Sequence, residues 1–403
     1  MPIITMAHHN SLLGNYDGEY TYPDTPVQDS NVATGFSTYS TDFFVNKFYT
    51  KTSNGTKSGK LAAVNRGWMP SIGAIDYSVN PDKKEFWIRR CAIIQPNWEA
   101  AEYLRDANLG FFYVTGANGK LVRSLQIFFD SSASLAFRVF AADGTKVVSS
   151  GVIATFAKWC IINADRECFT DIRINIDPVA GFIQCYDINC NLAGEFLGPT
   201  HGAVKPTHIG VTTVMDNWNN YWNDPWSISY YTPFAIAADE ATFGMYVTPL
   251  LCKANGRKQE QSVGDYNKHK YLLPLPKRTD AVSMLLDSAS PKQYTALIQS
   301  MSDATIPDTH EIMAFQFAGI FDADVGAPTK VETSLTMCDV NGTFIEDTKK
   351  QLVVNMKYDL NYNYQRHWSK VHNMSPFTGT SWTKAELAGV EIGFTVYPPT
   401  SLV

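Results

Sequence analysis

The residues best suited to chemistry lie close together between positions 216 and 226. Acidic and amide side chains alternate there with large aromatic ones, at Asp216, Asn217, Trp218, Asn219, Tyr221, Trp222 and Trp226. Flat aromatic faces stack on sugar rings while Asn and Asp bond the hydroxyls, so the segment indicates a sugar or ligand platform. Its oxygen atoms also suit calcium, although the calcium-loop spacing is absent. Packing against a sheet edge or another subunit is the interpretation that we favour, because nothing in the sequence fixes the directions of these side chains.

Carboxylates near the predicted strands offer a second kind of chemistry. Asp171, Asp177, Asp187 and Glu195 fall on or beside strands, and glycoside hydrolysis needs only two acids close in space. Carboxylates on the outer faces of strands are ordinarily solvated, however. The sequence also lacks a Gly-x-Ser-x-Gly elbow, a His-Glu-x-x-His helix, a P-loop and a dinucleotide-binding glycine loop. We therefore predict that the chain is not an enzyme and has no catalytic residues.

The cysteine pattern gives no sign of a metal site. The seven cysteines are irregularly spaced, and no C-x-x-C motif or zinc-type His spacing accompanies them. We expect reduced, mostly buried thiols, no bound metal and no cofactor.

Composition limits the possible partners. The 403 residues are 45% hydrophobic and 18% charged, which suits packed cores in about two domains. A net charge of -6 argues against a nucleic-acid partner. No apolar run approaches the roughly 20 residues that span a bilayer, and the N-terminus has no signal-peptide pattern. We expect a protein made in a cytoplasm, not secreted and without a membrane partner.

The sequence pattern of the first half of the chain predicts antiparallel strands. Short runs rich in aromatic and β-branched residues recur between turn signals, and Asn118-Gly119 and Asp143-Gly144 are typical of tight hairpins. The strands expected at 170–177, 181–187 and 194–198 follow one another in an order that resembles the late strands of laminin-G and concanavalin-type jelly rolls. The resemblance implies two curved sheets packed face to face.

The predicted fold class is all-β, with two antiparallel, jelly-roll-like β-sandwich domains and an extended N-terminal arm. The arm covers 1–40, the first sandwich 41–235 and the second 236–403. The arm is polar and without a period, which indicates an extended segment, and an arm that becomes ordered on a neighbouring subunit is the alternative. In the second domain we predict strands at 282–286, 312–320, 333–338 and 351–358, and a helix at 291–300.

The chain closes with a turn, a helix start and a strand between 376 and 394. Thr383 and Glu386 have the spacing of a capping box, and Gly389 is placed to end the helix in the left-handed conformation. From Val390 to Val396 apolar residues then alternate with Glu, Gly and Thr, which predicts a half-buried strand.

This closing segment resembles the end of a group of tailed-phage virion proteins. The matching residues are Pro376, Thr378, Gly379, Trp382, Thr383, Glu391 and Gly393. The resemblance implies a structural virion protein that is assembled in a host cytoplasm, as a tail fibre or adhesin or as a head fibre or decoration protein. Its partners would be copies of itself and other virion proteins, with a host-surface glycan as a further partner. A carbohydrate-binding module or a glycan depolymerase with a jelly-roll fold is the alternative.

Overall fold

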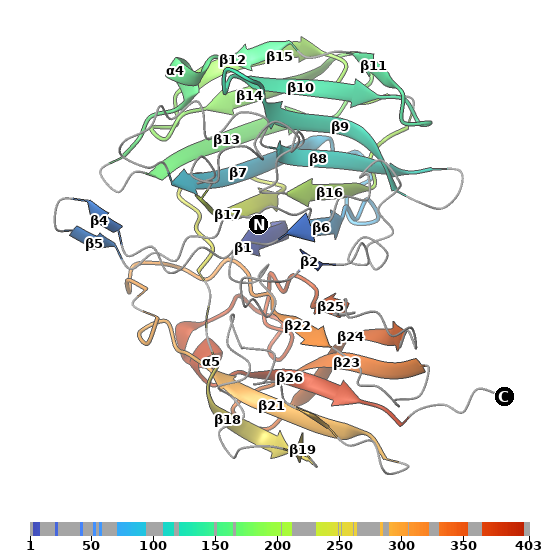
Figure 1. Cartoon of the computed structure of the whole chain (residues 1–403), viewed down its shortest axis with the longest axis vertical. Coiled ribbons are helices and arrows are strands. Elements are labelled where there is room, and N and C mark those ends of the chain that lie inside the picture. The colour runs from blue at the N-terminus through green and yellow to red at the C-terminus, as the bar shows by residue number, and fades with distance from the viewer. Residues whose placement is uncertain are drawn as a thin grey trace. The chain divides into compact units, whose positions relative to one another are not determined.

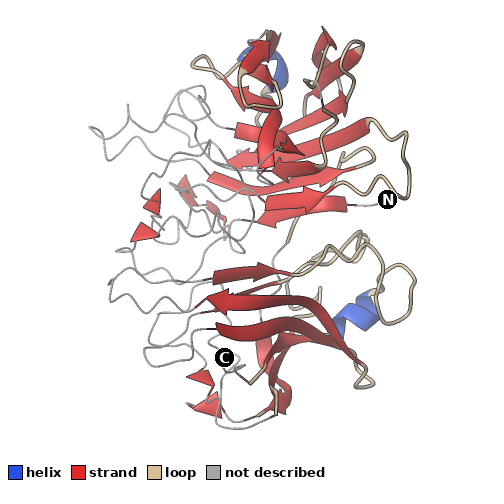
Figure 2. Ribbon diagram, turned by 90° about the vertical axis from the view of Figure 1, so that its right-hand side faces the viewer, coloured by secondary structure: helices blue, strands red, loops and turns tan. Residues whose placement is uncertain are grey.

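The computed structural model describes residues 3–8, 21–22, 41–42, 51–53, 56–58, 71–93, 108–116, 121–148, 151–163, 167–202, 204–211, 231–248, 250, 252–260, 262–263, 283–284, 290–304, 306–321, 330–353 and 365–398. Strands dominate these residues, so the predicted all-β fold class is confirmed (Figure 2). None of the described helices has the length and apolarity that crossing a membrane would need. The chain divides into two compact units: unit 1 comprises Met1–Leu12 and Ser30–Val247, and unit 2 comprises Leu13–Asp29 and Thr248–Val403.

Unit 1 is built from two antiparallel sheets (Figure 1). The six-stranded sheet has the order β1 (Ile3–His8), β17 (Tyr231–Ala238), β7 (Glu85–Ile93), β13 (Glu167–Asn175), β14 (Gly181–Tyr186) and β15 (Leu192–Gly198). The seven-stranded sheet has the order β11 (Lys146–Val148), β10 (Leu135–Phe140), β9 (Leu121–Phe129), β8 (Asn108–Thr115), β16 (His208–Val211) and β6 (Ser71–Ala74), with β12 (Val152–Ala154) beside β10.

The core of unit 1 lies between these sheets. The rings of Phe86 on β7 and Phe112 on β8 are 5.5 Å apart, and those of Phe137 on β10 and Phe196 on β15 are 4.2 Å apart. Phe86 and Phe112 are fully buried. Burial of such rings is the main favourable term for holding two sheets face to face.

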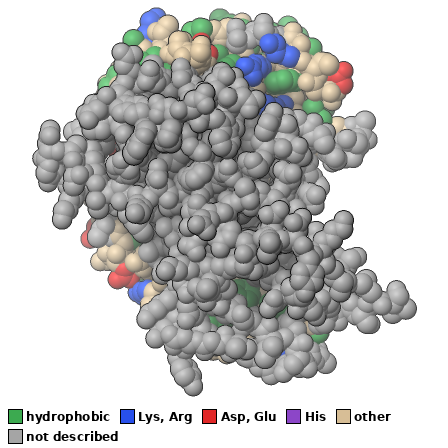
Figure 3. All heavy atoms as spheres, in the orientation of Figure 1, with side chains coloured by type: hydrophobic (Ala, Val, Ile, Leu, Met, Phe, Trp, Pro, Cys, Tyr) green, Lys and Arg blue, Asp and Glu red, His purple; other side chains and the backbone are tan. Residues whose placement is uncertain are grey.

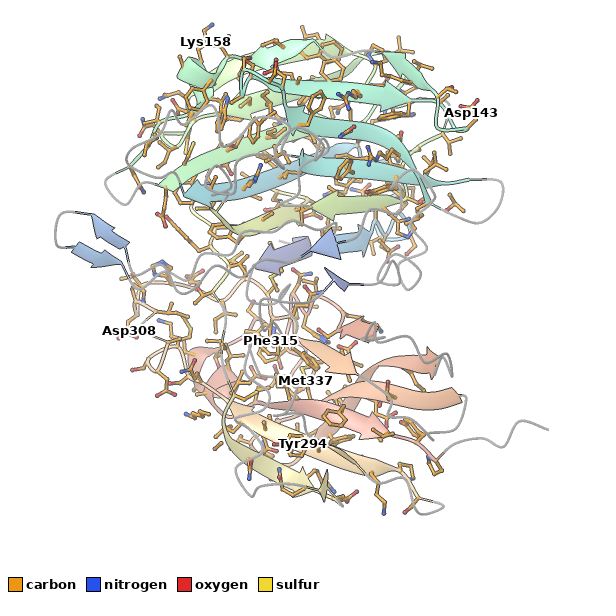
Figure 4. All side chains as sticks on the ribbon, viewed as in Figure 1. Asp143, Lys158, Tyr294, Asp308, Phe315 and Met337 are labelled. Atoms are coloured by element: carbon orange, nitrogen blue, oxygen red, sulfur yellow. The ribbon has the colours of Figure 1, made fainter. Side chains whose placement is uncertain are left out.

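The Asp-Gly signal at 143–144 marks a turn between β10 and β11, as predicted. Gly144 has φ of 87°, a conformation that favours glycine. The Oδ1 atom of Asp143 accepts hydrogen bonds from the backbone N–H and the hydroxyl of Thr145, at 2.8 and 2.6 Å. Figure 4 labels Asp143 at this tip.

Unit 2 contains a five-stranded antiparallel sheet. Its order is β18 (Cys252–Gln259), β21 (Lys292–Ile298), β26 (Glu391–Val396), β23 (Lys330–Cys338) and β24 (Phe344–Val353). The closing strand predicted from the sequence, β26, therefore lies at the centre. The helix predicted at 291–300 is wrong, because β21 occupies this stretch. Tyr294, Thr295 and Ala296 are consecutive and fully buried, which requires cover on both faces of a strand.

Other described strands form two-stranded pairs. They are β4 (Lys51–Ser53) with β5 (Thr56–Ser58), β19 (Ser262–Val263) with β20 (Ser283–Met284), and β22 (Ala318–Phe321) with β25 (Gln365–Trp368), while β2 (Thr21–Tyr22) and β3 (Thr41–Asp42) are strands of two residues each. The strand predicted at 312–320 is therefore too long. Phe315 makes an isolated bridge to His372 instead.

An apolar cluster packs on one face of the five-stranded sheet. Phe315, Met337, Trp382 and Leu387 belong to it, and Figure 4 labels Phe315 and Met337. Trp382 is 5% exposed, and its Nε1 donates to the backbone oxygen of His372 at 2.8 Å. The Trp of the closing segment is thus a core residue.

Helix α5 (Lys384–Ala388) begins where the sequence predicts. The hydroxyl of Thr383 accepts from the N–H of Glu386 at 3.1 Å, and the Glu386 carboxylate accepts a hydrogen bond from the hydroxyl of Ser375. The predicted left-handed ending is wrong, because Gly389 has φ of -102°. Its N–H bonds the Glu386 and Leu387 oxygens, so the helix ends without a left-handed residue.

Glu391 and Gly393, two of the matching residues of the closing segment, lie on β26, and the surroundings of each account for its residue type. Glu391 is 5% exposed, and its Oε2 accepts from the backbone N–H of Arg257 at 2.8 Å and from the hydroxyl of Thr295 at 2.7 Å. A Cβ atom added at Gly393 would lie 1.8 Å from the backbone oxygen of Tyr294. The neighbouring strand therefore leaves no room for a side chain at position 393.

The predicted domain limits remain predictions. The limit after residue 235 falls inside β17, which pairs with β7 as far as Ala238. Within the predicted arm, residues 3–8 form β1 and pair with β17 of the same chain. For residues 3–8, the chain's own sheet therefore provides the pairing partner.

Candidate binding surface on the six-stranded sheet

We define the outer face as the side of the six-stranded sheet that points away from the seven-stranded sheet. On β7, Ile88 points inward, because a Cβ atom added at Gly110 on β8 would lie 2.6 Å from its Cδ1. Residues at odd positions of β7 and β13 therefore point outward, since successive side chains alternate across a strand. Among the residues of the outer face are Glu85, Trp87, Arg89, Asp171, Arg173, Phe182, Gln184, Tyr186, Leu192, Glu195 and Leu197.

A polar row crosses this face. Trp87, Arg173, Gln184 and Glu195 are register partners on β7, β13, β14 and β15. The Nε2 atom of Gln184 donates to the Glu195 carboxylate at 2.6 Å, and its Oε1 accepts from the Tyr186 hydroxyl at 2.9 Å. These contacts fix which way the amide points, so the row presents a defined set of donors and acceptors.

Arg173 holds the centre of the row. Its Nε and Nη2 atoms donate to the two carboxylate oxygens of Glu85 at 2.8 and 2.7 Å, which is a bidentate pair. The hydrogen bonds to Glu85 raise the pKa of Arg173, so the guanidinium stays charged. Its carbon lies 5.1 Å from the ring centre of Phe182 and 6.0 Å from that of Trp87. Two aromatic side chains and a carboxylate therefore hold one cation in place.

One half of the outer face is closed. Arg89 Nη1 lies 2.5 Å from Asp171 Oδ2, and the hydroxyl of Thr242 donates to Asp171 Oδ1 at 2.7 Å. Both members of the ion pair are buried. Burial raises the pKa of Asp171, and the charge of Arg89 acts against that shift.

Aromatic packing completes the closed half. Phe243 lies with its ring centre 5.1 Å from Trp87 and 5.4 Å from Tyr186, edge to face in both cases. Arg89 lies 4.4 Å from the ring of Phe169 and 5.8 Å from that of Tyr246. The segment after β17 thus covers the outer face over Arg89 and Asp171.

The other half of the outer face is open to solvent, and its partly or fully exposed residues are Glu85, Arg173, Phe182, Gln184, Leu192, Glu195 and Leu197. Leu197 is 70% exposed and Leu192 is 53% exposed, and Glu195 between them is exposed. Leu197 pairs with Phe182, and Leu192 pairs with Tyr186. Figure 3 shows hydrophobic, basic and acidic side chains side by side on the described surface of unit 1. The open half therefore combines apolar side chains with an ordered polar row, as partner surfaces do.

The side chains of the open half can provide binding contacts. Glu195 and Glu85 supply acceptors, Arg173 supplies donors, and Phe182 supplies an aromatic face. Such a set suits either a polar protein surface or the hydroxyl groups of a saccharide.

The residues predicted as a platform, Asp216, Asn217, Trp218, Asn219, Tyr221, Trp222 and Trp226, lie outside the described part of the chain. Their role stays a prediction.

The four candidate carboxylates have separate surroundings. Asp171 pairs with Arg89, and Asp177 accepts from Lys84 and from the turn amides of Val179 and Ala180. Asp187 accepts from the amides of Asn189 and Asn191 in the turn between β14 and β15. Glu195 is the member of this set exposed on the outer face. The first three therefore have structural roles in the ion pair and turns.

Sequence reasoning missed Glu85, Arg173, Phe182 and Gln184 as surface partners. The alternation of side chains along a strand does predict that Arg173 and Ile172 point to different faces of the sheet, and that Gln184 and Ile183 do so too. The sequence does not give the order and register of the strands, which place side chains of β7 and β15 on the same face of the sheet. In the described ranges, no group of three or more His, Cys, Asp or Glu side chains is arranged to hold a metal ion.

Comparisons with known proteins give structural likenesses only. No protein-family model matches the chain, and no curated protein sequence matches it. The CBM2 module of the evolved Dit of Lactobacillus casei BL23 phage J-1 is similar at 13% identity, over 58% of this chain and 94% of that module, with a TM-score of 0.28.

Two further solved structures are similar at comparable levels. Tailspike protein 2 of Escherichia coli O157:H7 bacteriophage CAB120 has 11% identity over 36% of this chain and 23% of the tailspike, with a TM-score of 0.21. Arcelin-5, a lectin-like defense protein from Phaseolus vulgaris, has 11% identity over 42% of this chain and 81% of arcelin-5, with a TM-score of 0.19. Two of the three are phage proteins, at TM-scores too low to carry function across.

Proposed function

We propose that the chain is a non-enzymatic structural component of a tailed-phage particle, on the tail or the head surface, that acts through protein–protein assembly. The proposal starts from the resemblance of the closing segment to virion proteins. Three of the matching residues have structural roles in unit 2: Trp382 and Glu391 are buried, and Gly393 lies where the neighbouring strand leaves no room for a side chain.

The observation that carries the assembly role is the open half of the outer face. Leu192 and Leu197 expose more than half of their surface on either side of Glu195. Burying exposed leucine against a partner is favourable by about 25 cal/mol per Å² of apolar surface, and the polar row would fix orientation. The proposed occupants are copies of this chain or other virion proteins.

The order of strands supports a finer proposal for unit 1, a jelly roll of the concanavalin or laminin-G kind. Strands β13, β14 and β15 are consecutive in the chain and adjacent in the sheet, as that resemblance implies.

The test is peptide mass spectrometry across density-purified particles from a lysate. We expect the chain at a fixed ratio to the other particle proteins, with a copy number in threes, fives or sixes according to its position. A chain that stays in the soluble fraction would overturn the proposal.

A surface variant tests the open half itself. Changing Leu192 and Leu197 together to Asp should lower incorporation by about tenfold or more, equivalent to about 1.4 kcal/mol of contact energy. The matched control is Val179→Asp, since Val179 is 76% exposed but lies in the turn between β13 and β14. Equal incorporation of both variants would remove the open half from assembly.

Carbohydrate binding is the second candidate, favoured by the ring of Phe182 beside Arg173 and Gln184. A glycan array with the full chain tests it. Phe182→Ala should abolish binding if the outer face is the site. Loss only on combined replacement of Trp218, Trp222 and Trp226 by Ala would assign binding to that segment, and no glycan signal with the unchanged chain would remove this candidate.

A further inference from the structure

Two cysteines of unit 1 lie with their sulfur atoms in contact. The Sγ atoms of Cys160 and Cys168 are 2.9 Å apart, and both thiols are free. A disulfide bond joins sulfur atoms about 2.0 Å apart. The pair is therefore within about an ångström of bonding distance before any oxidation.

Cys160 is held in place by the helix before it. Helix α4 (Phe156–Trp159) ends at Cys160, whose N–H donates to the Phe156 oxygen at 2.9 Å. Trp159 is 1% exposed, its Nε1 donates to the backbone oxygen of Ala133 at 3.0 Å, and its ring stacks on Phe129 at 4.5 Å. Lys158, labelled in Figure 4, marks this helix. A buried anchor immediately precedes the cysteine, so Cys160 has little freedom to move away.

Cys168 is held by the sheet. It lies on β13, pairs with Ala92 of β7 and is 1% exposed. An isolated bridge joins Ile162 to Cys168. Close by, the N–H of Asn163 donates to the Glu167 oxygen at 3.1 Å, and the N–H of Glu167 donates to Asn163 Oδ1 at 2.9 Å. The fold has thus already closed the loop that a bond between the two cysteines would close.

The two thiols differ in access. Cys160 is half-buried, whereas Cys168 is buried. Burial and the contact with Cys160 raise the pKa of the Cys168 thiol. A small oxidant therefore reaches Cys160 first, and Cys168 reacts second.

We infer that Cys160 and Cys168 form an oxidative modification site, at which a low-molecular-weight disulfide converts the two thiols to an intramolecular disulfide. The Cys160 thiolate attacks one sulfur of the small disulfide and expels one thiolate, which leaves a mixed disulfide on Cys160. The Cys168 thiolate then attacks Cys160 Sγ and expels the second small thiol. The two cysteine protons end on the two small thiols, and the small disulfide gains two electrons.

The bond would connect the end of α4 to β13. If the proposed function holds, a particle released by lysis passes from a reducing cytoplasm to an oxidising medium, and the link would form after assembly. The chemistry itself needs no particle, so its test is independent of that proposal.

The test treats the folded full chain with oxidised glutathione, blocks remaining thiols by alkylation at low pH and maps peptides by mass spectrometry. We expect most molecules to carry a peptide pair joined through Cys160 and Cys168, without bound glutathione. In Cys168→Ser, glutathione should stay on Cys160, because no second thiol displaces it. Cys190→Ser is the matched control, since Cys190 is exposed, and should form the bridge like the unchanged chain.

Two outcomes would overturn the inference. One is lasting glutathione on Cys160 in the unchanged chain, and the other is a joined peptide from a different cysteine pair. Should Cys168→Ser fail to fold by circular dichroism, Cys160→Ser replaces it. In that variant Cys168 should take up glutathione at least about tenfold more slowly than Cys160 does in the unchanged chain, because it is buried.

Discussion

In the closing segment of unit 2, Trp382 and Glu391 are turned into the protein, whereas on the outer face of unit 1, Leu197 and Glu195 face solvent. Both regions combine apolar side chains with a carboxylate. The closing segment has a recognisable sequence motif because the immediate surroundings of each motif residue require that residue type. The outer face has no such motif, because its residues come from four strands. In this protein a local sequence motif therefore predicts the fold around it, whereas the candidate partner surface can be identified only from the register of the paired strands.

The largest effect should come from filling the space at Gly393. A Cβ atom there would lie 1.8 Å from the backbone oxygen of Tyr294, and β26 is the central strand, so the sheet cannot move aside. Gly393→Ala should lower the free energy of unfolding of unit 2 by more than about 4 kcal/mol, measured by urea unfolding.

The control for that change is Gly379→Ala in the same motif. Gly379 has φ of 72°, and no atom lies within 4 Å of its added Cβ. Only backbone strain of about 1–2 kcal/mol should result. Equal losses for the two glycines would contradict the view that Gly393 is fixed by the neighbouring strand.

The closed and open halves of the outer face should respond differently to loss of arginine. Arg89→Leu leaves the buried carboxylate of Asp171 without its ion partner, which should cost about 3–5 kcal/mol. Arg173→Leu breaks a pair whose side chains are 33% and 40% exposed, and should cost about 0–1 kcal/mol. Chemical denaturation of both variants checks this. Similar costs would mean that the open half is as structural as the closed half.

Acid should destabilise the protein through its exposed turn carboxylates. The hydrogen bond from Lys253 lowers the pKa of Asp303 from 3.8 to about 2, and the backbone N–H of Ser300 contributes. The folded state then binds fewer protons than the unfolded state, so this contribution is present above pH 3.8 and is lost as the pH falls toward 2. Unfolding free energies measured between these values should fall less steeply for Asp303→Asn.

Lys253→Met should weaken the same dependence, because it removes the largest cause of the shift. Asp171 on the outer face behaves oppositely. Burial raises its pKa, so its contribution to stability declines as the pH rises through that value. If neither Asp303→Asn nor Lys253→Met changes how the free energy of unfolding depends on pH, Asp303 does not cause the loss of stability in acid.

The smallest effect on stability should come from Glu195→Gln. The side chain is exposed, so the free energy of unfolding should change by less than about 0.5 kcal/mol. Glu391→Gln is the matched change in the closing segment. It removes the negative charge and turns one of the two buried carboxylate oxygens, which together accept from three groups of Arg257 and Thr295, into an NH2 donor, and should cost about 1–3 kcal/mol. Thermal or urea unfolding of both compares the two regions directly.

Several features of the fold could be predicted from the sequence alone, because they depend on interactions between residues close together in the chain. The all-β class, the Asp143-Gly144 turn, the Thr383 cap and the strand of β26 follow from side chains within a few residues of one another. The helix predicted at 291–300 failed because three consecutive buried residues look the same in a strand covered on both faces as in a helix. Only the tertiary structure could decide that β26 is central, that residues 3–8 join the chain's own sheet, and that Glu85, Arg173, Gln184 and Glu195 share one face. These facts depend on strand order and register, which are set by contacts between residues far apart in the chain.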